Sequence, residues 1–188
     1  MTPSRPPPRR ASPSDGGLPD LDDRAAGLLL HPTSLPGPRG GGELGSAAHA
    51  FVDFAARAGA RWWQMLPVGP TGYGNSPYQS PSGHAGNPAL VDLGALAAEG
   101  WLGDADLAPL ARLAPRRVSF GRLIPLKQAL LARAAAAFLK DADGEKRGEF
   151  ERFCAESASW LEDYAAFMAL KDAHGGRAWT EWSGSKSA

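Results

Sequence analysis

The sequence predicts an α/β fold that opens with two parallel strands joined by a helix and continues as a mostly helical region. Two short apolar runs suit strands: 27–30, closed by His31-Pro32 and expected to be buried on both faces, and 62–66, closed by Pro67. Between them, apolar residues recur at helical spacing, with Ser46 placed to cap the helix and Gly59 to end it. A strand, a helical connection and a second strand form a βαβ unit, whose strands run parallel.

The composition of the 188 residues excludes several classes of protein. The 20 basic and 20 acidic residues give a formal net charge of +0, without the basic excess that nucleic-acid binding needs. No apolar stretch reaches the roughly 18 to 20 residues of a membrane span, and the N-terminus lacks the apolar core of a secretory signal. We therefore expect a cytoplasmic protein with no nucleic-acid or membrane partner. Cys154, the single cysteine, is expected to be a buried thiol.

The chain divides into segments of different character. Residues 1–23 are rich in proline and arginine and lack apolar periodicity, so we predict a disordered leader. The segment 24–92 carries the βαβ unit and two turn-rich loops, and the segment 93–182 is mostly helical. Within the latter, helices are predicted at 93–98, 124–140 and 145–173, with irregular chain at 102–120.

The last predicted helix carries aromatic residues at helical spacing. A stripe of this kind is expected to pack in a core. Its members are Phe150, Phe153, Trp160, Tyr164 and Phe167.

The sequence contains no pattern typical of a metal site or of a catalytic acid. The four histidines are far apart, and no paired cysteine or histidine spacing occurs, so we expect no metal ligands. Glu162 and Asp163 are neighbours on a predicted helix, so their side chains point about 100° apart and cannot act on one substrate. A Gly-x-Ser-x-Gly nucleophile motif is also absent.

The loops that follow the two strands are the candidate site. In α/β barrels, ligands bind at the carboxyl ends of strands, where both loops lie. The second loop, 69–88, offers aromatic rings with hydroxyl and amide groups, which suit a neutral sugar whose C–H faces pack on rings. The same residue types are ordinary turn formers, which leaves a purely structural loop as an alternative. The residues concerned are Tyr73, Ser76, Tyr78, Gln79 and Asn87.

Several long motifs extend over residues 25–182. The first are Gly-Leu-Leu-Leu-His-Pro-Thr-Ser-Leu-Pro-Gly-Pro at 27–38, Trp-Gln-Met-Leu-Pro-Val-Gly-Pro-Thr-Gly-Tyr-Gly-Asn-Ser-Pro-Tyr-Gln-Ser at 63–80 and Ala-Gly-Asn-Pro at 85–88. Later ones are Trp-Leu-Glu-Asp-Tyr at 160–164, Phe-Met-Ala-Leu-Lys at 167–171, His-Gly-Gly at 174–176 and Trp179. In this order the motifs resemble the N-terminal signature of the bacterial 4-alpha-glucanotransferases, or amylomaltases, of glycoside hydrolase family 77.

The resemblance implies the N-terminal part of a (β/α)8 TIM barrel with a helical insertion, incomplete in this sequence. Such enzymes transfer a segment of an α-1,4-glucan to a new 4-hydroxyl on glucose or another glucan by a retaining double displacement. No metal or organic cofactor is implied. The implied partners are α-1,4-glucans, maltooligosaccharides and the missing C-terminal part of the barrel. The family's catalytic carboxylates lie beyond residue 188, so we assign no catalytic residue and expect the chain alone to be inactive.

The resemblance also assigns roles in substrate binding. Tyr78 matches the tyrosine that packs on the sugar beside the scissile bond, with Ser76 nearby, and Tyr73 offers a second sugar platform at the rim. Loop-shaping roles near the site fall to His31, Gln64 and Asn87.

Some positions depart from the family pattern. Asn75 stands where an aspartate is usual, and Gly83-His84 replaces a small and an apolar residue. The tail 183–188 abandons the pattern after Trp182, which suggests a truncation or a frameshift. Two alternatives remain: a non-catalytic glucan-binding or helical interaction protein, and an α-amylase-like glycoside hydrolase. Strands without barrel neighbours also predict poor stability of the isolated chain, with exposed apolar faces.

Overall fold

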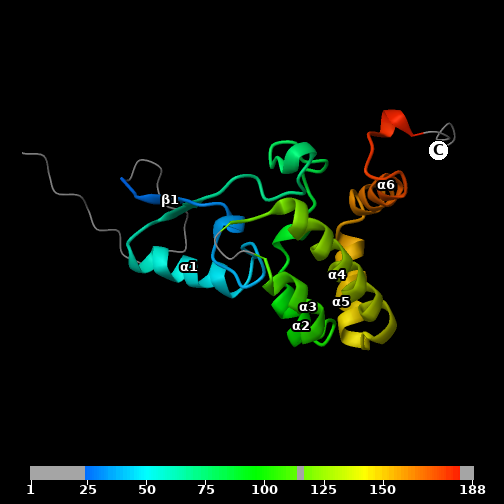
Figure 1. Cartoon of the computed structure of the whole chain (residues 1–188), viewed down its shortest axis with the longest axis horizontal. Helices are drawn as coiled ribbons and strands as arrows, with labels where there is room; N and C mark the ends of the chain where they lie inside the picture. The colour runs from blue at the N-terminus through cyan, green and yellow to red at the C-terminus, as the bar shows by residue number, and fades with distance from the viewer. Residues whose placement is uncertain (1–23, 114–116, 183–188) are drawn as a thin grey trace, which may run out of the picture.

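The computed structural model describes residues 24–113 and 117–182. The molecule is elongated, with a strand-and-helix unit at one end and a group of helices at the other (Figure 1). The predicted disordered leader and the divergent tail lie outside the described residues. None of the helices in the described part of the chain is long and apolar enough to cross a membrane.

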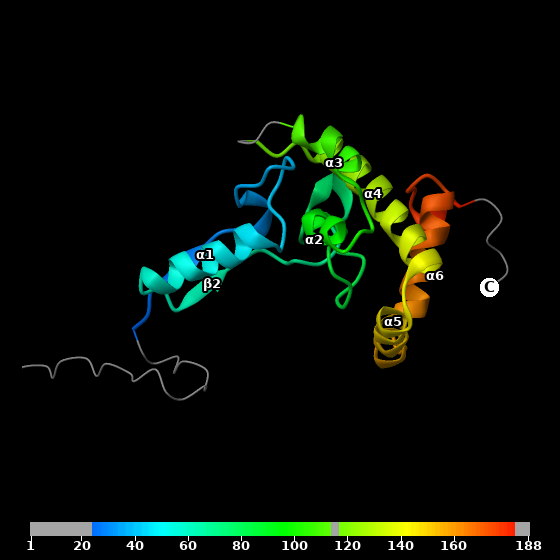
Figure 2. The ribbon, with the colours of Figure 1, turned by 90° about the horizontal axis from the view of Figure 1, so that it is seen from below.

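The predicted parallel βαβ unit is confirmed. β1 (Gly27–Leu29) and β2 (Trp62–Gln64) pair in parallel, with Leu28 opposite Trp63. Helix α1 (Ser46–Arg57) connects them and lies along the strand pair in both ribbon views (Figures 1 and 2). The Phe51 ring of α1 meets the Trp63 ring edge-on, with the ring centroids 4.8 Å apart.

A glycine lies next to each end of α1. Gly59 has a φ of 78° and ends the helix, as expected. The predicted cap, Ser46, is instead the first helical residue, and Gly45 occupies the N-cap position. A Cβ atom at Gly45 would overlap the Asp92 carboxylate, so glycine allows the loop before α1 to approach that side chain.

The prediction that the first strand, β1, is buried on both faces is wrong. The outer residues of both strands are exposed, and Leu29 is 66% exposed. The reason is that two strands and one helix provide cover for only one face. Phe54 and Val52 of α1 are also exposed, which agrees with the expectation of open apolar faces.

The hydrophobic core lies in the helical part, where α2 (Leu93–Ala98), α3 (Asp104–Ala111) and α4 (Phe120–Asp141) pack together. Its buried members are Leu93, Leu102, Leu110, Leu113, Leu123 and Ala134. Helix α3 falls where irregular chain was predicted. It contains Pro109, and at its start the Asp106 carboxylate accepts a hydrogen bond of 2.8 Å from the N–H of the N-cap residue, Gly103.

The single helix predicted at 145–173 is two helices, α5 (Gly144–Glu156) and α6 (Leu161–Ala173). The break follows Ser157, and Trp160 has a non-helical φ of −142°. Helical periodicity continues across this break, so the apolar pattern alone does not reveal it.

The predicted core role of the aromatic stripe is wrong for its first members. Phe150 and Phe153 are 45% and 50% exposed. Cys154, which lies on the same helix and was expected to be buried, is only partly buried. Trp160 and Tyr164 are half-buried, and their ring centroids lie 6.3 Å apart. The stripe therefore leaves part of α5 as an open apolar surface.

Candidate functional site

The loop after β2 closes on itself through Ser76. The Ser76 carbonyl accepts hydrogen bonds of 3.3 Å from the N–H groups of Gly72 and Gln79. The Ser76 hydroxyl accepts a further bond of 3.3 Å from the Tyr78 N–H. A Cβ at Gly72 would overlap the carbonyl oxygen of Gln79, so the two arms of the loop approach closely. The loop therefore holds Tyr78 on a locally ordered turn.

The two tyrosines of this loop project into solvent. Tyr73 begins the 3-10 turn η2 (Tyr73–Asn75) and is 91% exposed, while Tyr78 is 71% exposed. Neither ring is among the described side chains that line the cavities beneath the loop. Both rings can therefore pack against a ligand that approaches from outside.

The structure accommodates both positions of this loop that differ from the family pattern, Asn75 and Gly83-His84. Asn75 has a φ of 58°, in the left-handed region that asparagine and aspartate tolerate better than other residues with a Cβ. Asparagine in place of the usual aspartate thus keeps the turn. The His84 ring stacks on Trp160 at a centroid distance of 5.8 Å, and this contact joins the loop to the start of α6.

His31 caps the short 3-10 turn η1 (Pro32–Ser34) that follows β1. Its Nδ1 accepts a hydrogen bond of 3.3 Å from the Thr33 N–H and lies 2.8 Å from the Thr33 hydroxyl oxygen. The neutral ring therefore carries its proton on Nε2. Nε2 is buried without a hydrogen-bond partner among the described residues, and the His31 side chain lines a cavity beneath the tyrosine loop.

Gln64 and Asn87 hold backbone segments beside the loop. The Gln64 carbonyl accepts a hydrogen bond of 3.0 Å from the Leu30 N–H at the end of the strand pair. Asn87 is buried, and its N–H donates to the Val68 carbonyl at 3.1 Å. The Asn87 Oδ1 accepts a bond of 2.9 Å from the Ala89 N–H and caps the 3-10 turn η3 (Pro88–Leu90).

Two cavities of about 150 and 200 Å³ lie beneath the loop. Both are lined by Thr71, Asn75 and Asn87, which contribute hydroxyl and amide groups. Tyr164 of α6 lines the smaller cavity, and burial raises the pKa of its hydroxyl. No carboxylate belongs to either lining among the described residues, and the Lys127 side chain lines the smaller cavity.

The described residues include no group of three or more His, Cys, Asp or Glu side chains that could hold a metal ion. The arrangement offers exposed aromatic rings and neutral hydrogen-bonding groups at the carboxyl ends of two parallel strands. Chemically, these groups can bind and orient a polyhydroxylated ligand.

Comparison with known proteins identifies the family. The sequence profile of glycoside hydrolase family 77, described as 4-alpha-glucanotransferase, matches residues 30–188. The chain belongs to the 4-alpha-glucanotransferase family. The resemblance stated from the motifs is therefore confirmed.

Relatives of this 4-alpha-glucanotransferase-family chain include bacterial and plant proteins. The 4-alpha-glucanotransferase of Thermus thermophilus is 52% identical over 159 residues, which cover 85% of this chain and 31% of the relative. The Synechocystis enzyme of the same name is 45% identical, covering 86% and 32%. The chain thus spans about a third of the length of these curated relatives.

A solved structure resembles this family member in fold. It is the amylomaltase from Streptococcus agalactiae in complex with acarbose, with a TM-score of 0.78 and 38% sequence identity. The match covers 86% of this chain and 32% of the solved chain. The α/β character predicted from the sequence is therefore confirmed in a chain whose described part is mostly helical with a small sheet.

A buried ionic network that the sequence did not predict lies behind the site of this family member. Lys127 of α4 is 2% exposed, and its Nζ donates to the carbonyls of Ala89 and Val91 at 2.6 and 2.7 Å. Nζ also lies 2.7 Å from Glu43 Oε1, and Arg39 bridges Glu43 and Asp92 at 3.1 and 2.9 Å.

The network shifts two pKa values. Burial lowers the pKa of Lys127, against the opposing effect of Glu43. Burial acts to raise the pKa of Asp92, but hydrogen bonds from the Gly94 and Ala95 N–H groups, together with Arg39, outweigh it and lower this pKa. A lysine on the apolar face of a predicted helix is the sequence signal that could have revealed the network.

Proposed function

We propose that this chain forms the glucan-facing, N-terminal part of a 4-alpha-glucanotransferase. The whole enzyme would transfer a segment of an α-1,4-glucan to a new 4-hydroxyl on glucose or another glucan by a retaining double displacement. The observation that carries this proposal is the placement of Tyr78 and Tyr73. Both rings are exposed on a closed loop at the carboxyl end of β2, in a chain whose family carries this name.

The proposed ligand follows from the chemistry of the loop. The Tyr78 ring offers a flat face for the C–H surface of a sugar, and such stacking contributes roughly 1 kcal/mol beyond area burial. Ser76 holds the backbone beneath this ring. Tyr73, farther out, would serve as a second platform at the rim. The solved S. agalactiae relative was obtained with acarbose, a maltooligosaccharide analogue, which supports a ligand of this class.

The loop-shaping role proposed for His31, Gln64 and Asn87 rests on their contacts. His31 and Asn87 cap the short turns after β1 and before α2, and Gln64 joins the strand ends. These residues would fix the backbone that presents the tyrosines. We assign the sugar contacts themselves to Tyr78, Ser76 and Tyr73.

The fold proposal assigns β1 and β2 to the first two strands of a (β/α)8 barrel. The segment 24–92 would supply two βα units with their loops, and the segment 93–182 a helical insertion. The exposed faces of Leu29 and Trp62 support this proposal, because further strands would cover them. The catalytic carboxylates would come from later strands, which accords with cavity linings that hold no carboxylate among the described residues. Cytoplasmic location stays a prediction.

A chimeric enzyme tests the proposal. Residues 30–182 would replace the matching segment of the T. thermophilus relative, and the product would be incubated with maltotriose. We expect glucose and longer maltodextrins from the chimera and no turnover by the 188-residue chain alone. Release of reducing sugar without longer products would instead indicate an α-amylase-like hydrolase. Glucan binding by a correctly folded chimera that shows no turnover would indicate a non-catalytic binding protein.

A further inference from the structure

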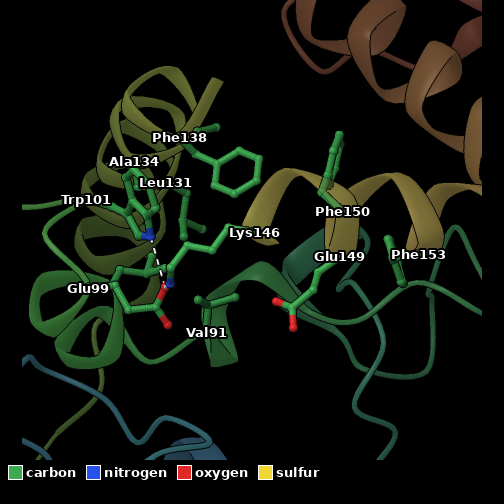
Figure 3. Close-up of a pocket in the computed structure, with 12 residues that line it drawn as sticks. Val91, Glu99, Trp101, Leu131, Ala134, Phe138, Lys146, Glu149, Phe150 and Phe153 are labelled. Carbon is green, nitrogen blue, oxygen red and sulfur yellow. Dashed lines mark hydrogen bonds and ion pairs between the residues drawn. The ribbon is translucent and has the colours of Figure 1, made fainter. Parts of the chain in front are cut away.

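An apolar groove runs between α4 and α5, apart from the tyrosine loop. Figure 3 shows Phe138 of α4 facing α5, with Phe150 and Phe153 of α5 along the same opening. Trp101, which follows α2, lines the groove as well, and the cavity has a volume of about 580 Å³. Phe150 and Phe153 are each about half exposed, so the groove presents aromatic surface to solvent.

Three aromatic rings of the groove form a continuous series of contacts. The Trp101 and Phe138 ring centroids lie 5.4 Å apart in an edge-on contact, and the Phe138 and Phe150 centroids lie 5.6 Å apart in another. The exposed parts of such rings are surfaces on which flat, rigid side chains can pack. Proline rings in an extended polyproline II segment are ligands of this kind, because that helix is already formed before binding.

Charged groups line the groove beside the rings. Lys146 forms an ion pair with Glu99, which also accepts a hydrogen bond of 3.0 Å from the Trp101 Nε1–H (Figure 3). Glu149 is exposed on the same wall. Two carboxylates against one ammonium group give this lining an excess of negative charge, which favours a basic ligand.

The chain itself contains a segment with this chemistry. Residues 1–23 precede the part matched by the family, which begins at residue 30, so family membership assigns this segment no role. It contains a triple proline, 6–8, flanked by arginines. The prolines suit the aromatic rings of the groove, and the arginines suit its carboxylates. The arginines are Arg5, Arg9 and Arg10.

We propose that the proline and arginine segment 5–10 docks in the aromatic groove between α4 and α5. Pro6 to Pro8 would pack against Phe138 and Phe150, and Arg9 or Arg10 would pair with Glu149. Residues 11–24 can span at most about 50 Å, so docking occurs within one chain where that reach suffices and otherwise between two chains. In either case the segment covers the half-exposed rings of α5.

Photo-crosslinking of the full 188-residue chain tests the proposal. A benzoylphenylalanine probe replaces Pro7, and mass spectrometry locates the crosslinked residues. We expect crosslinks to Trp101 and to the segment 131–153. Mixing isotopically light and heavy chains separates docking within a chain from docking between chains, and either pattern supports the proposal. Crosslinks confined to other parts of the molecule, or none above background, would overturn it.

Charge-swap variants provide the matched controls. Glu149→Lys, at an exposed position, should lower the crosslink yield about fivefold, as should Arg9→Glu with Arg10→Glu. Arg9→Lys with Arg10→Lys keeps the charge and should retain the yield. Combining Glu149→Lys with the two arginine reversals should restore it. A yield that none of these changes alters would show that the assigned charge pairing is wrong.

Discussion

Lys127 Nζ lies 2.7 Å from Glu43 Oε1, although the two residues come from a helix of the core and from a loop before α1. The same ammonium group donates to the carbonyls of Ala89, within the turn that Asn87 caps, and of Val91, just after that turn. One buried side chain thus joins α4, the loop before α1 and the backbone next to the tyrosine loop. The helical region is in this way coupled to the candidate site.

Replacement of the buried ammonium should destabilise this junction. Lys127→Met leaves Glu43 with Arg39 as its remaining ionic partner in a buried setting, and we expect a loss of about 3 kcal/mol. Hydrogen exchange of the α4 amides measures the loss without requiring the whole chain to unfold cooperatively. Lys146→Met, which breaks an exposed ion pair with Glu99, is the control and should change α4 protection little. Equal effects of the two substitutions would contradict the account.

The junction should also weaken in acid. The pKa of Asp92 lies below its ordinary value of 3.8, so the folded state keeps the carboxylate charged where the unfolded state binds a proton. The stabilisation from Asp92 is therefore complete above about pH 4 and is lost as the pH falls through the lowered pKa.

Asp92→Asn isolates this contribution, because asparagine still caps α2 but does not titrate. The measurement is the urea midpoint of the helical circular-dichroism signal between pH 2 and 6. We expect the midpoint of the variant to fall less in acid than that of the parent chain. Parallel pH profiles would show that Asp92 does not contribute in this way.

Alanine substitutions at two glycines of the tyrosine loop should have different effects on glucan binding. Gly72→Ala places a Cβ against the Gln79 carbonyl and should force the arms of the loop apart, whereas Gly86→Ala meets nothing within 4 Å. Maltoheptaose binding to the chimeric enzyme, measured by calorimetry, should weaken about tenfold for Gly72→Ala and stay unchanged for Gly86→Ala. If both variants bind like the parent, the closed form of the loop is not needed for binding.

Loss of an exposed ring should affect binding without affecting stability. Tyr78→Ala removes the proposed stacking surface and should weaken glucan binding about five- to tenfold in the chimera. Tyr78→Phe keeps the ring and should bind nearly as well as the parent. Because Tyr78 is largely exposed, the melting temperature should stay within about 1 °C for both variants. A lower melting temperature for Tyr78→Ala would indicate a structural role instead.

The sequence predicted what local patterns determine. The parallel strand pair and α1 follow from two apolar runs, the helical periodicity between them and Gly59, all of which are local signals. The sequence predicted irregular chain at 102–120, but α3 forms there with Pro109 inside it and with the Asp106 carboxylate bonded to the Gly103 N–H. The end of α5 was missed because helical periodicity continues past Ser157.

Long-range contacts could not be predicted from spacing. Lys127 is buried because partners 36 to 84 positions away in the sequence satisfy its charge and its donors. The exposure of Phe150 likewise depends on which elements pack on α5, and helical spacing fixes only that the aromatic residues share a face. For the site, the sequence predicted the position of the tyrosine loop. The hydrogen bonds of Ser76 that close this loop are seen only in the structure.

A crystal structure of the chimeric enzyme with acarbose tests the central claim most directly. The account predicts that a sugar ring lies against the face of Tyr78, at van der Waals distance, on the open side of the loop after β2. Acarbose bound elsewhere in a well-ordered complex, with the Tyr78 ring still in solvent, would contradict it.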